Sequence, residues 1–407
     1  MKRIFHLNIR GFILAAAFSA GLGFGTSASA EHSFLIDLNS RTVTELGTLG
    51  GDGTVAADLN DGAQVVGYSY TAEGSYRGFI TGPNGMGMRD LGTLGGNNFS
   101  RAYGINEAGQ VVGSSSPSND LYEHAFITGP DGTGMRDLGT LGSFGSTAVG
   151  INNAGQVTGY SNQAGFITGP DGMGMRDLGT FGQGAVFITP RSINGAGQVV
   201  GSSGASDLPS QAFITGPDGT GFRNLGSLGG NDSVATGIND AGQTVGASLT
   251  AERTYHAFIT GPDGMGMTDL GTLGGNDSAA LDINDAGQVV GNSATAEGGR
   301  SVFITGPNGE GMMDLNSLVN LPPRVTLTDA VAINNNGQVI AMGLIPEPET
   351  YALMIAGLGL LGFMVRRKKG SEQQVSLLIC VISLIFQGKA VRASPAVKIV
   401  FLDCPCK

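Results

Sequence analysis

Short apolar runs alternate with polar turn residues along most of the chain. The runs are four to six residues long and rich in β-branched and aromatic side chains, and Asn, Asp, Gly and Pro separate them, which is typical of β-strands joined by turns. In residues 279–316 the runs AALDIN, QVVGNS, SVFITG and MMDLN follow one another in this way. The pattern predicts four short strands in this stretch.

The same four-run pattern returns along the chain. Every copy except the first, which has a variant of it, carries an Asn-x-x-Gly-Gln turn between its first two runs, as in INDAGQVVG at 283–291. We call this turn the clasp. Its glutamine recurs at intervals of 46, 46, 42, 45, 45 and 50 residues, at Gln64, Gln110, Gln156, Gln198, Gln243, Gln288 and Gln338. Repeated four-strand units of about 45 residues are typical of β-propeller blades.

The clasp sequence predicts a hairpin turn. Its Asn caps the turn with its side chain, and its Gly supplies the positive φ that a following bulge requires. The first copy has Gly62 and Ala63 exchanged, so the geometry of that turn is expected to differ. A calcium loop would need several converging carboxylates, but Asp follows the clasp Asn only at Asp61, Asp240 and Asp285. We therefore interpret the clasp as a turn and predict no metal site.

The two ends of the repeat region complement each other. The strand that contains FITGP occurs six times against seven clasps, and its seventh copy lies at the front of the chain, at Phe34. The chain thus begins with the last two strands of a blade and ends, at VAINNNGQVIAMG, with the first two. An open solenoid would require end caps, whereas a closed ring removes exposed edge strands. We predict an all-β, seven-bladed β-propeller over residues 31–343, closed by N- and C-terminal half-blades.

Length variation is concentrated in two loops of each unit, after the second strand and after the fourth. In an up-and-down blade these loops emerge on the same face, and insertions confined to one face indicate where a partner binds. Ordinary tolerant loops are the alternative. The candidate binding-face residues are Tyr70, Tyr76, Phe99, Arg101, Tyr122, Phe144, Arg253, Tyr255 and Arg300.

Composition and charge narrow the function. The chain has 70 Gly and no Trp, and residues 31–343 contain 11 Arg, no Lys and 29 Asp or Glu, a net charge of −18. Such a surface repels phosphate backbones, so we expect no nucleic-acid partner. The cysteines all lie at the end of the chain, at Cys380, Cys404 and Cys406, so packing and hydrogen bonds must hold the repeats together.

Catalytic patterns are scarce in the repeats. His32, His124 and His256 each precede a strand Phe by two residues, and equivalent positions in separate blades are too far apart to share zinc. There is no Gly-x-Ser-x-Gly elbow and no Cys–His pair. Carboxylates are plentiful, and a pair at the central channel in only one or two blades would favour a glycosidase. We predict no catalytic residue and no cofactor.

The first thirty residues have the features of a secretory signal peptide. Lys2, Arg3 and Arg10 precede an apolar run, and Ala28-Ser29-Ala30 offers a cleavage site before Glu31. An uncleaved anchor is the alternative. We therefore expect export of a chain that starts at Glu31.

The composition changes abruptly after Gly343. Pro346, Glu347 and Pro348 lead into fifteen largely apolar residues at 351–365, and a basic cluster follows at Arg366, Arg367, Lys368 and Lys369. The apolar run predicts a short transmembrane helix with its basic end in the cytoplasm, rather than a buried core helix.

These residues carry two resemblances. The segment 344–369 resembles the PEP-CTERM sorting signal of Gram-negative bacteria, which implies processing by an exosortase and delivery to the cell surface or an exopolysaccharide matrix. The repeats resemble the HAF family of probable extracellular repeats, through HAFITGP at 124–130 and 256–262 and DLGTLGG at 90–96 and 269–275. Residues 370–407 continue past the usual end of the signal, and we interpret them as a read-through or frame artefact, with a real extension as the alternative.

The function expected from the sequence is that of a non-catalytic, exported surface or extracellular-matrix protein. It would be anchored transiently in the inner membrane, and it would bind a partner, with exopolysaccharide as the candidate, through one loop face. A carbohydrate-active enzyme on a propeller scaffold and a multivalent lectin are the alternatives. The enzyme would release new reducing ends, and the lectin would have equivalent sugar sites in several blades.

Overall fold

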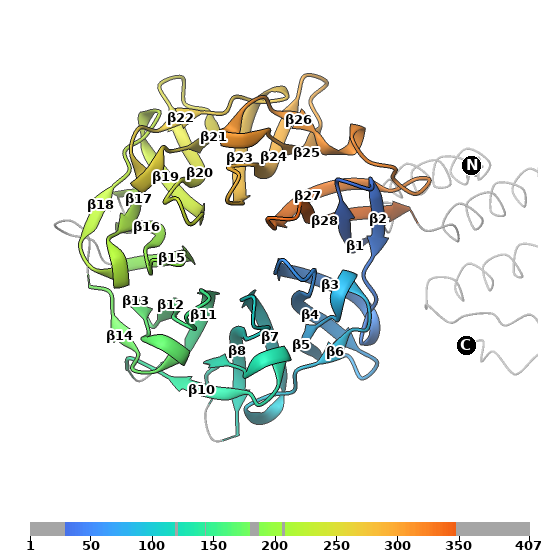
Figure 1. Ribbon diagram of the computed structural model, residues 1–407, viewed down its shortest axis with the longest axis vertical. Coiled ribbons are helices and arrows are strands. Elements are labelled where there is room, and N and C mark those ends of the chain that lie inside the picture. Colours follow the sequence, from blue (N-terminus) through green and yellow to red (C-terminus); the bar gives the residue numbers. More distant parts are fainter. Residues whose placement is uncertain (1–28, 119–120, 143, 180–186, 206–207, 347–407) are drawn as a thin grey trace, which may run out of the picture. The chain divides into compact units, whose positions relative to one another are not determined.

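The chain folds into seven four-stranded antiparallel sheets arranged as blades around a central channel (Figure 1). The computed structural model describes residues 29–118, 121–142, 144–179, 187–205 and 208–346. This architecture confirms the predicted seven-bladed β-propeller. The predicted signal-peptide core and transmembrane helix lie outside the described residues.

Six blades are continuous in sequence, and within each of them the first strand lies next to the channel and the fourth lies outermost (Figure 1). Blade 1 consists of β3 (Gly50–Leu59), β4 (Val65–Thr71), β5 (Tyr76–Ile80) and β6 (Arg89–Asp90). Blade 2 consists of β7 (Gly95–Ile105), β8 (Val111–Pro117), β9 (His124–Ile127) and β10 (Arg136–Gly139). Blade 3 consists of β11 (Ser146–Ile151), β12 (Val157–Ser161), β13 (Ala164–Ile167) and β14 (Arg176–Asp177).

The next three blades follow the same order. Blade 4 consists of β15 (Phe187–Ile193), β16 (Val199–Ala205), β17 (Leu208–Thr215) and β18 (Phe222–Asn224). Blade 5 consists of β19 (Gly229–Ile238), β20 (Thr244–Thr250), β21 (Tyr255–Ile259) and β22 (Thr268–Asp269). Blade 6 consists of β23 (Gly274–Ile283), β24 (Val289–Thr295), β25 (Arg300–Ile304) and β26 (Met313–Asp314). Short 3₁₀ helices lie in the turns, η1 (Pro83–Gly85), η2 (Pro130–Gly132), η3 (Pro170–Gly172), η4 (Pro217–Gly219), η5 (Pro262–Gly264), η6 (Pro307–Gly309) and η7 (Leu315–Ser317).

Blade 7 is built from both ends of the chain. It combines β27 (Thr326–Ile333) and β28 (Gln338–Pro346) with β1 (Ser29–Asp37) and β2 (Thr42–Glu45), in the order β2-β1-β28-β27. β1 and β28 pair antiparallel, from Ser29 opposite Pro346 to Asp37 opposite Gln338. The predicted closure by two half-blades is confirmed, and β28 continues three residues past the expected end of the repeats at Gly343.

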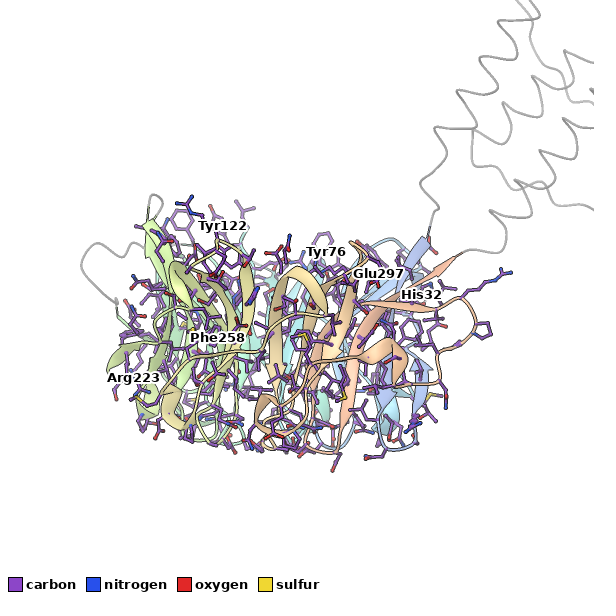
Figure 2. All side chains as sticks on the ribbon, turned by 90° about the horizontal axis from the view of Figure 1, so that it is seen from above. His32, Tyr76, Tyr122, Arg223, Phe258 and Glu297 are labelled. Atoms are coloured by element: carbon purple, nitrogen blue, oxygen red, sulfur yellow. The ribbon has the colours of Figure 1, made fainter. Side chains whose placement is uncertain are left out.

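A buried phenylalanine in the third strand from the channel anchors every blade. In blade 5 it is Phe258, which is fully buried and lies opposite Gly246 of β20 (Figure 2). A Cβ added to Gly246 would lie 3.0 Å from the Phe258 ring and 2.0 Å from the Val234 carbonyl oxygen, so only glycine fits there. The other continuous blades repeat this pair as Gly67–Phe79, Gly113–Phe126, Gly159–Phe166, Gly201–Phe213 and Gly291–Phe303.

The hydrophobic core lies between neighbouring blades rather than within them. Val245 and Ile259 of blade 5, for example, pack in one cluster with Ile283, Val289 and Phe303 of blade 6. A single blade therefore exposes apolar surface on both sides, and only the closed ring buries all of it.

The clasps are hairpin turns, as predicted. The clasp Asn accepts a hydrogen bond from the main-chain N–H of the clasp Gln, at 3.0 Å from Gln243 to Asn239 Oδ1, and the clasp Gly242 has φ = 77°. The first clasp was expected to differ, but Ala63 takes the glycine position with φ = 55°, and the Gln64–Asn60 hydrogen bond is again 3.0 Å. Alanine can adopt this conformation at a cost of roughly 1–2 kcal/mol, so the turn is kept at the expense of backbone strain.

Candidate functional site

The turns divide the ring into two faces. The clasps and the turns after FITGP share one face, because the Gly264 N–H donates to the clasp carbonyl of Gly242 at 2.9 Å. The loops after the second strands and between blades share the other, where Leu49 bridges to Thr71. We call these the clasp face and the loop face. Tyr76 and Tyr122 lie on the loop face (Figure 2), so the sequence assigned the variable loops to one face correctly.

Aromatic side chains gather on the loop face over blades 1 to 3. Tyr76 lies at the centre, with ring centroids 4.6 Å from Phe99, 6.0 Å from Tyr68 and 6.2 Å from Tyr70. A second pair adjoins this group, in which the rings of Tyr122 and Phe144 are 5.4 Å apart. We define the aromatic patch as Tyr68, Tyr70, Tyr76, Phe99, Arg101, Tyr122, Glu123 and Phe144.

Arg101 ties the two halves of the aromatic patch together. Its guanidinium carbon lies 4.3 Å from the centroid of the Tyr76 ring, and it also donates to the Tyr76 hydroxyl. On the other side it pairs with Glu123 at 3.2 Å. Burial alone would lower the pKa of Arg101, but the Glu123 carboxylate holds it above its usual value. The guanidinium is therefore charged, stacked on a ring and electrically compensated.

The aromatic patch presents an open apolar surface. Tyr70, Phe99, Tyr122 and Phe144 are between 38% and 50% exposed, although large apolar side chains usually bury most of their area. Contiguous exposed apolar patches of this kind mark interaction sites. Six of the nine predicted binding-face residues thus belong to one surface.

The other three predicted residues do not join this surface. Arg253 and Tyr255 belong to blade 5, where the Tyr255 N–H donates to Asp277 at 3.0 Å, and Arg300 belongs to β25 of blade 6. No ring contact connects them to the aromatic patch among the described residues.

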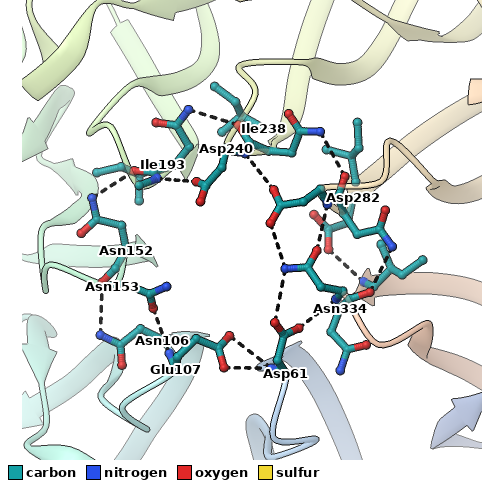
Figure 3. A pocket seen from close by; sticks show the side chains of 18 of the residues that line it. Asp61, Asn106, Glu107, Asn152, Asn153, Ile193, Ile238, Asp240, Asp282 and Asn334 are labelled. Carbon is teal, nitrogen blue, oxygen red and sulfur yellow. Dashed lines mark hydrogen bonds between the residues drawn. The ribbon is translucent and has the colours of Figure 1, made fainter. Parts of the chain in front are cut away.

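On the clasp face the clasp asparagines form a closed belt. Each Asn Nδ2 donates to the carbonyl oxygen of the clasp Asn in the next blade, and the last bond returns from Asn334 to Asn60 at 3.0 Å (Figure 3). The other six bonds are 3.0–3.2 Å long and join Asn60, Asn106, Asn152, Asn194, Asn239, Asn284 and Asn334 in order. The sequence predicted the turn but not this second use of the same side chain.

The residues that follow the clasp asparagines line the channel mouth on this face, around a cavity of about 190 Å³ (Figure 3). Four of them are acidic, namely Asp61, Glu107, Asp240 and Asp285. Asn335 separates two of these, because its Nδ2 donates to Asp285 at 2.9 Å and to Asp61 at 3.3 Å. Burial raises the pKa of Glu107. Because four acidic side chains surround it, the channel mouth is acidic.

The channel wall above this mouth carries two further carboxylates that the sequence did not single out. Asp58 accepts the N–H groups of Leu59, at 2.8 Å, and of Ile105 in the next blade, at 3.0 Å. Asp282 accepts the N–H of Ile333 in the next blade at 2.9 Å. Both line a cavity of about 230 Å³ together with Tyr103 and Arg191. This is a carboxylate pair in two blades only, the feature that would favour an enzyme.

The pKa values of both carboxylates are raised. Burial, with the charge of Asp282 as a second cause, raises the pKa of Asp58 to about 8. Burial raises the pKa of Asp282 to about 6. Withdrawal from water therefore favours the protonated form of each carboxyl group.

We expect stability to fall as pH rises, because a folded state with raised carboxyl pKa values binds more protons than the unfolded chain. The loss begins near the unfolded Asp pKa of about 4 and ends near pH 6 for Asp282 and pH 8 for Asp58. Urea unfolding of Asp58→Asn should remove on the order of 2 kcal/mol of the difference between pH 4 and pH 8. Parallel pH profiles for the variant and the wild type would contradict this.

The three histidines of the repeats stay within their own blades. His124 and His256 bond to Asp137 and Asp269 at 2.8 Å, and His32 bonds to Glu45 at 2.6 Å, so each His joins the third strand from the channel to the outermost one. Within the described part of the chain, no group of three or more His, Cys, Asp or Glu side chains could hold a metal ion.

The predicted processing residues lie at or beyond the edge of the described chain. Ala30 and Glu31 belong to β1 and pair with Ile345 and Leu344, and Pro346 is the last residue of β28. Ala28, Glu347, Pro348 and the basic cluster Arg366, Arg367, Lys368 and Lys369 lie outside the described residues. No helix in the described ranges is long and apolar enough to cross a membrane.

Comparison with known proteins identifies the C-terminal tail. Residues 344–368 match the PEP-CTERM protein-sorting motif, and this match begins inside β28. The motif implies export, processing by an exosortase and sorting to the cell surface. A comparison with curated proteins finds no match to this chain.

Two solved structures resemble the chain at low sequence identity. The putative TolB of Agrobacterium tumefaciens is 11% identical, with 79% of this chain and 100% of that chain covered and a TM-score of 0.43. The propeller domain of the Trilobed protease from Pyrococcus furiosus is 8% identical, with 72% and 94% covered and a TM-score of 0.45. These likenesses carry no information on ligands.

Proposed function

We propose that this protein is a non-catalytic propeller of the cell surface or extracellular matrix that binds a carbohydrate polymer, exopolysaccharide of its host, through the aromatic patch. The observation that carries this proposal is the group of exposed rings around Tyr76, since sugar rings stack their C–H faces on such surfaces. The sorting motif supports it, because it implies delivery to the surface where such polymers lie.

The charge of the site favours a neutral polymer over an acidic one. Arg101 is already paired with Glu123, and the propeller around it carries a net charge of −18. An anionic polysaccharide would meet repulsion without a free cation in the patch to offset it. Binding to a neutral polymer should depend little on salt.

The finer points of the sorting pathway are part of the same proposal. The chain would be held in the inner membrane by a short helix at 351–365 until an exosortase removes the tail. The repeats would belong with HAF-type extracellular proteins, on the strength of HAFITGP and DLGTLGG.

Replacing Tyr76 by Ala tests the binding site. The ring contacts three other aromatic side chains and Arg101, and an aromatic contact contributes about 0.5–1.5 kcal/mol, so we expect about a tenfold weaker affinity for host exopolysaccharide. Co-sedimentation of the purified protein with the polymer measures it.

Tyr255→Ala is the matched control, because it removes a tyrosine from the start of the equivalent strand in blade 5, outside the aromatic patch. It should leave the affinity unchanged. Equal losses in the two variants, or no binding by the wild type, would refute the proposed site.

The two channel carboxylates favour a second candidate, a carbohydrate-active enzyme. A carboxyl group with a raised pKa close to a second carboxyl group is the arrangement of a general acid and its partner. Incubation of host polysaccharide with the protein decides between the two. New reducing ends that disappear in Asp58→Asn would identify the enzyme, and their absence supports the binding protein.

A further inference from the structure

Three blades place a charged side chain in the wall of the central channel where the repeat does not require one. Asp58 and Asp282 stand two residues before the clasp Asn, and Arg191 stands three before it. The equivalents of the two Asp residues in the other blades are small, namely Gly104, Gly150, Ser192, Gly237 and Ala332. Packing explains those, since a Cβ at Gly237 would lie 3.2 Å from the Cα of Asp282. Packing does not explain why Asp58, Asp282 and Arg191 occur at these positions.

Arg191 stands across the channel from Asp58. It belongs to β15 of blade 4, which lies on the opposite side of the ring from β3 of blade 1, and Asp58 belongs to β3 (Figure 1). Its side chain is exposed within the channel, and it makes no hydrogen bond or ion pair with any described residue. The guanidinium therefore has its full donor capacity available.

The carboxylates likewise lack a cation. Their oxygens accept main-chain N–H groups, and no described Arg or His pairs with Asp58 or Asp282. Acidic and basic side chains thus line one cavity of about 230 Å³ without a bond between them.

We propose that the channel binds a small zwitterion of the amino-acid class, with its ammonium group at Asp282 and Asp58 and its carboxylate at Arg191. This goes beyond the proposed carbohydrate binding and uses other residues. A ligand with both charges compensates both walls at once, whereas an amine or a carboxylate alone compensates one. The volume suits a single small molecule and not a polymer.

The acidic channel mouth on the clasp face also favours a ligand that carries an ammonium group. Asp61, Glu107, Asp240 and Asp285 surround the entrance below the two channel carboxylates. Their field attracts an ammonium group and repels a purely anionic ligand. A molecule that enters by this mouth is therefore expected to lead with its ammonium end.

Titration calorimetry of the secreted protein with a length series tests the proposal. The probes are glycine, β-alanine, γ-aminobutyrate and ε-aminocaproate, and methylamine and acetate are the single-charge controls. We expect at least one zwitterion to bind ten times more tightly than either control. Arg191→Gln and Asp282→Asn should each reduce that affinity at least tenfold, while Val149→Ala, an uncharged change in the same wall, should leave it within twofold.

Three results would overturn the proposal. Methylamine that binds as tightly as every zwitterion would make the channel a simple cation site. No binding by any probe to a protein that still binds exopolysaccharide would exclude the channel site while leaving the aromatic patch intact. Release of reducing ends that depends on Asp58 would make the channel catalytic.

Discussion

A chain without β1 and β2 is expected not to fold. Deleting residues 31–47 removes Phe34, Leu35, Ile36 and Leu46 from two core clusters and leaves β28 as an exposed edge. Each of these side chains contributes about 1.5–3 kcal/mol on burial, so together they match the whole stability of a typical domain. An open edge also invites aggregation. Circular dichroism and size-exclusion chromatography should show loss of the cooperative unfolding transition and of the monomer.

A circular permutant is the matched control. Residues 31–47 are moved behind Pro346 through a short turn, which the pairing of Ser29 with Pro346 makes feasible. This chain has the same composition and can form all seven blades, so it should fold and unfold cooperatively. A deleted chain that unfolds like the wild type would show that the ring does not need its closing strands.

Phe258→Ala is expected to lower the free energy of unfolding by about 3–5 kcal/mol. The ring is fully buried between blades 4 and 5, where it packs with Val200, Ile214 and Ile238, and Gly246 opposite it offers no side chain that could fill the cavity. Urea unfolding measures the change.

The exposed Tyr255 of the same strand provides the comparison. Tyr255→Ala should change stability by less than about 0.5 kcal/mol, because surface substitutions usually do. A loss of similar size at both positions would mean that the phenylalanine positions do not carry the core.

The sequence predicted the ring because its signals are local and repeated. The clasp fixes one hairpin per unit, and the Phe34 copy at the front shows how the ends meet. Ala63 shows the limit of such reasoning. The exchange of Gly62 and Ala63 predicted a different turn geometry, but the surrounding blade imposes on Ala63 the positive φ that glycine has in the other clasps.

The channel and the belt were missed for a different reason. The bond from Asn284 to the carbonyl of Asn334 joins residues that are fifty positions apart and exists only once neighbouring blades are in place. Asp58 and Asp282 did leave a signal, because they stand where five other units have Gly, Ser or Ala. Aligning the positions before each clasp, and not only the turn itself, would have revealed them.

The aromatic patch was predicted in part. Loop-length variation identified the face, and six of the nine residues lie together on it. Tyr68 and Glu123 were missed because Tyr68 lies inside a strand and Glu123 shows its role only through its pairing with Arg101. Arg253, Tyr255 and Arg300 lie on the same loop face but belong to blades 5 and 6, away from the aromatic patch. Sequence spacing places a side chain on a face, but it does not show which side chains from different blades come together.

The position of β28 determines how the ring responds to mechanical force. This strand lies between β1 and β27, and the chain leaves it at Pro346 toward the C-terminus. A pull on the tail in the direction of β28 therefore loads two antiparallel ladders along their length, so that their hydrogen bonds must yield together in shear rather than one by one as in peeling. Blade 7 therefore resists unfolding at β28, the strand through which a force on the tail would enter the ring.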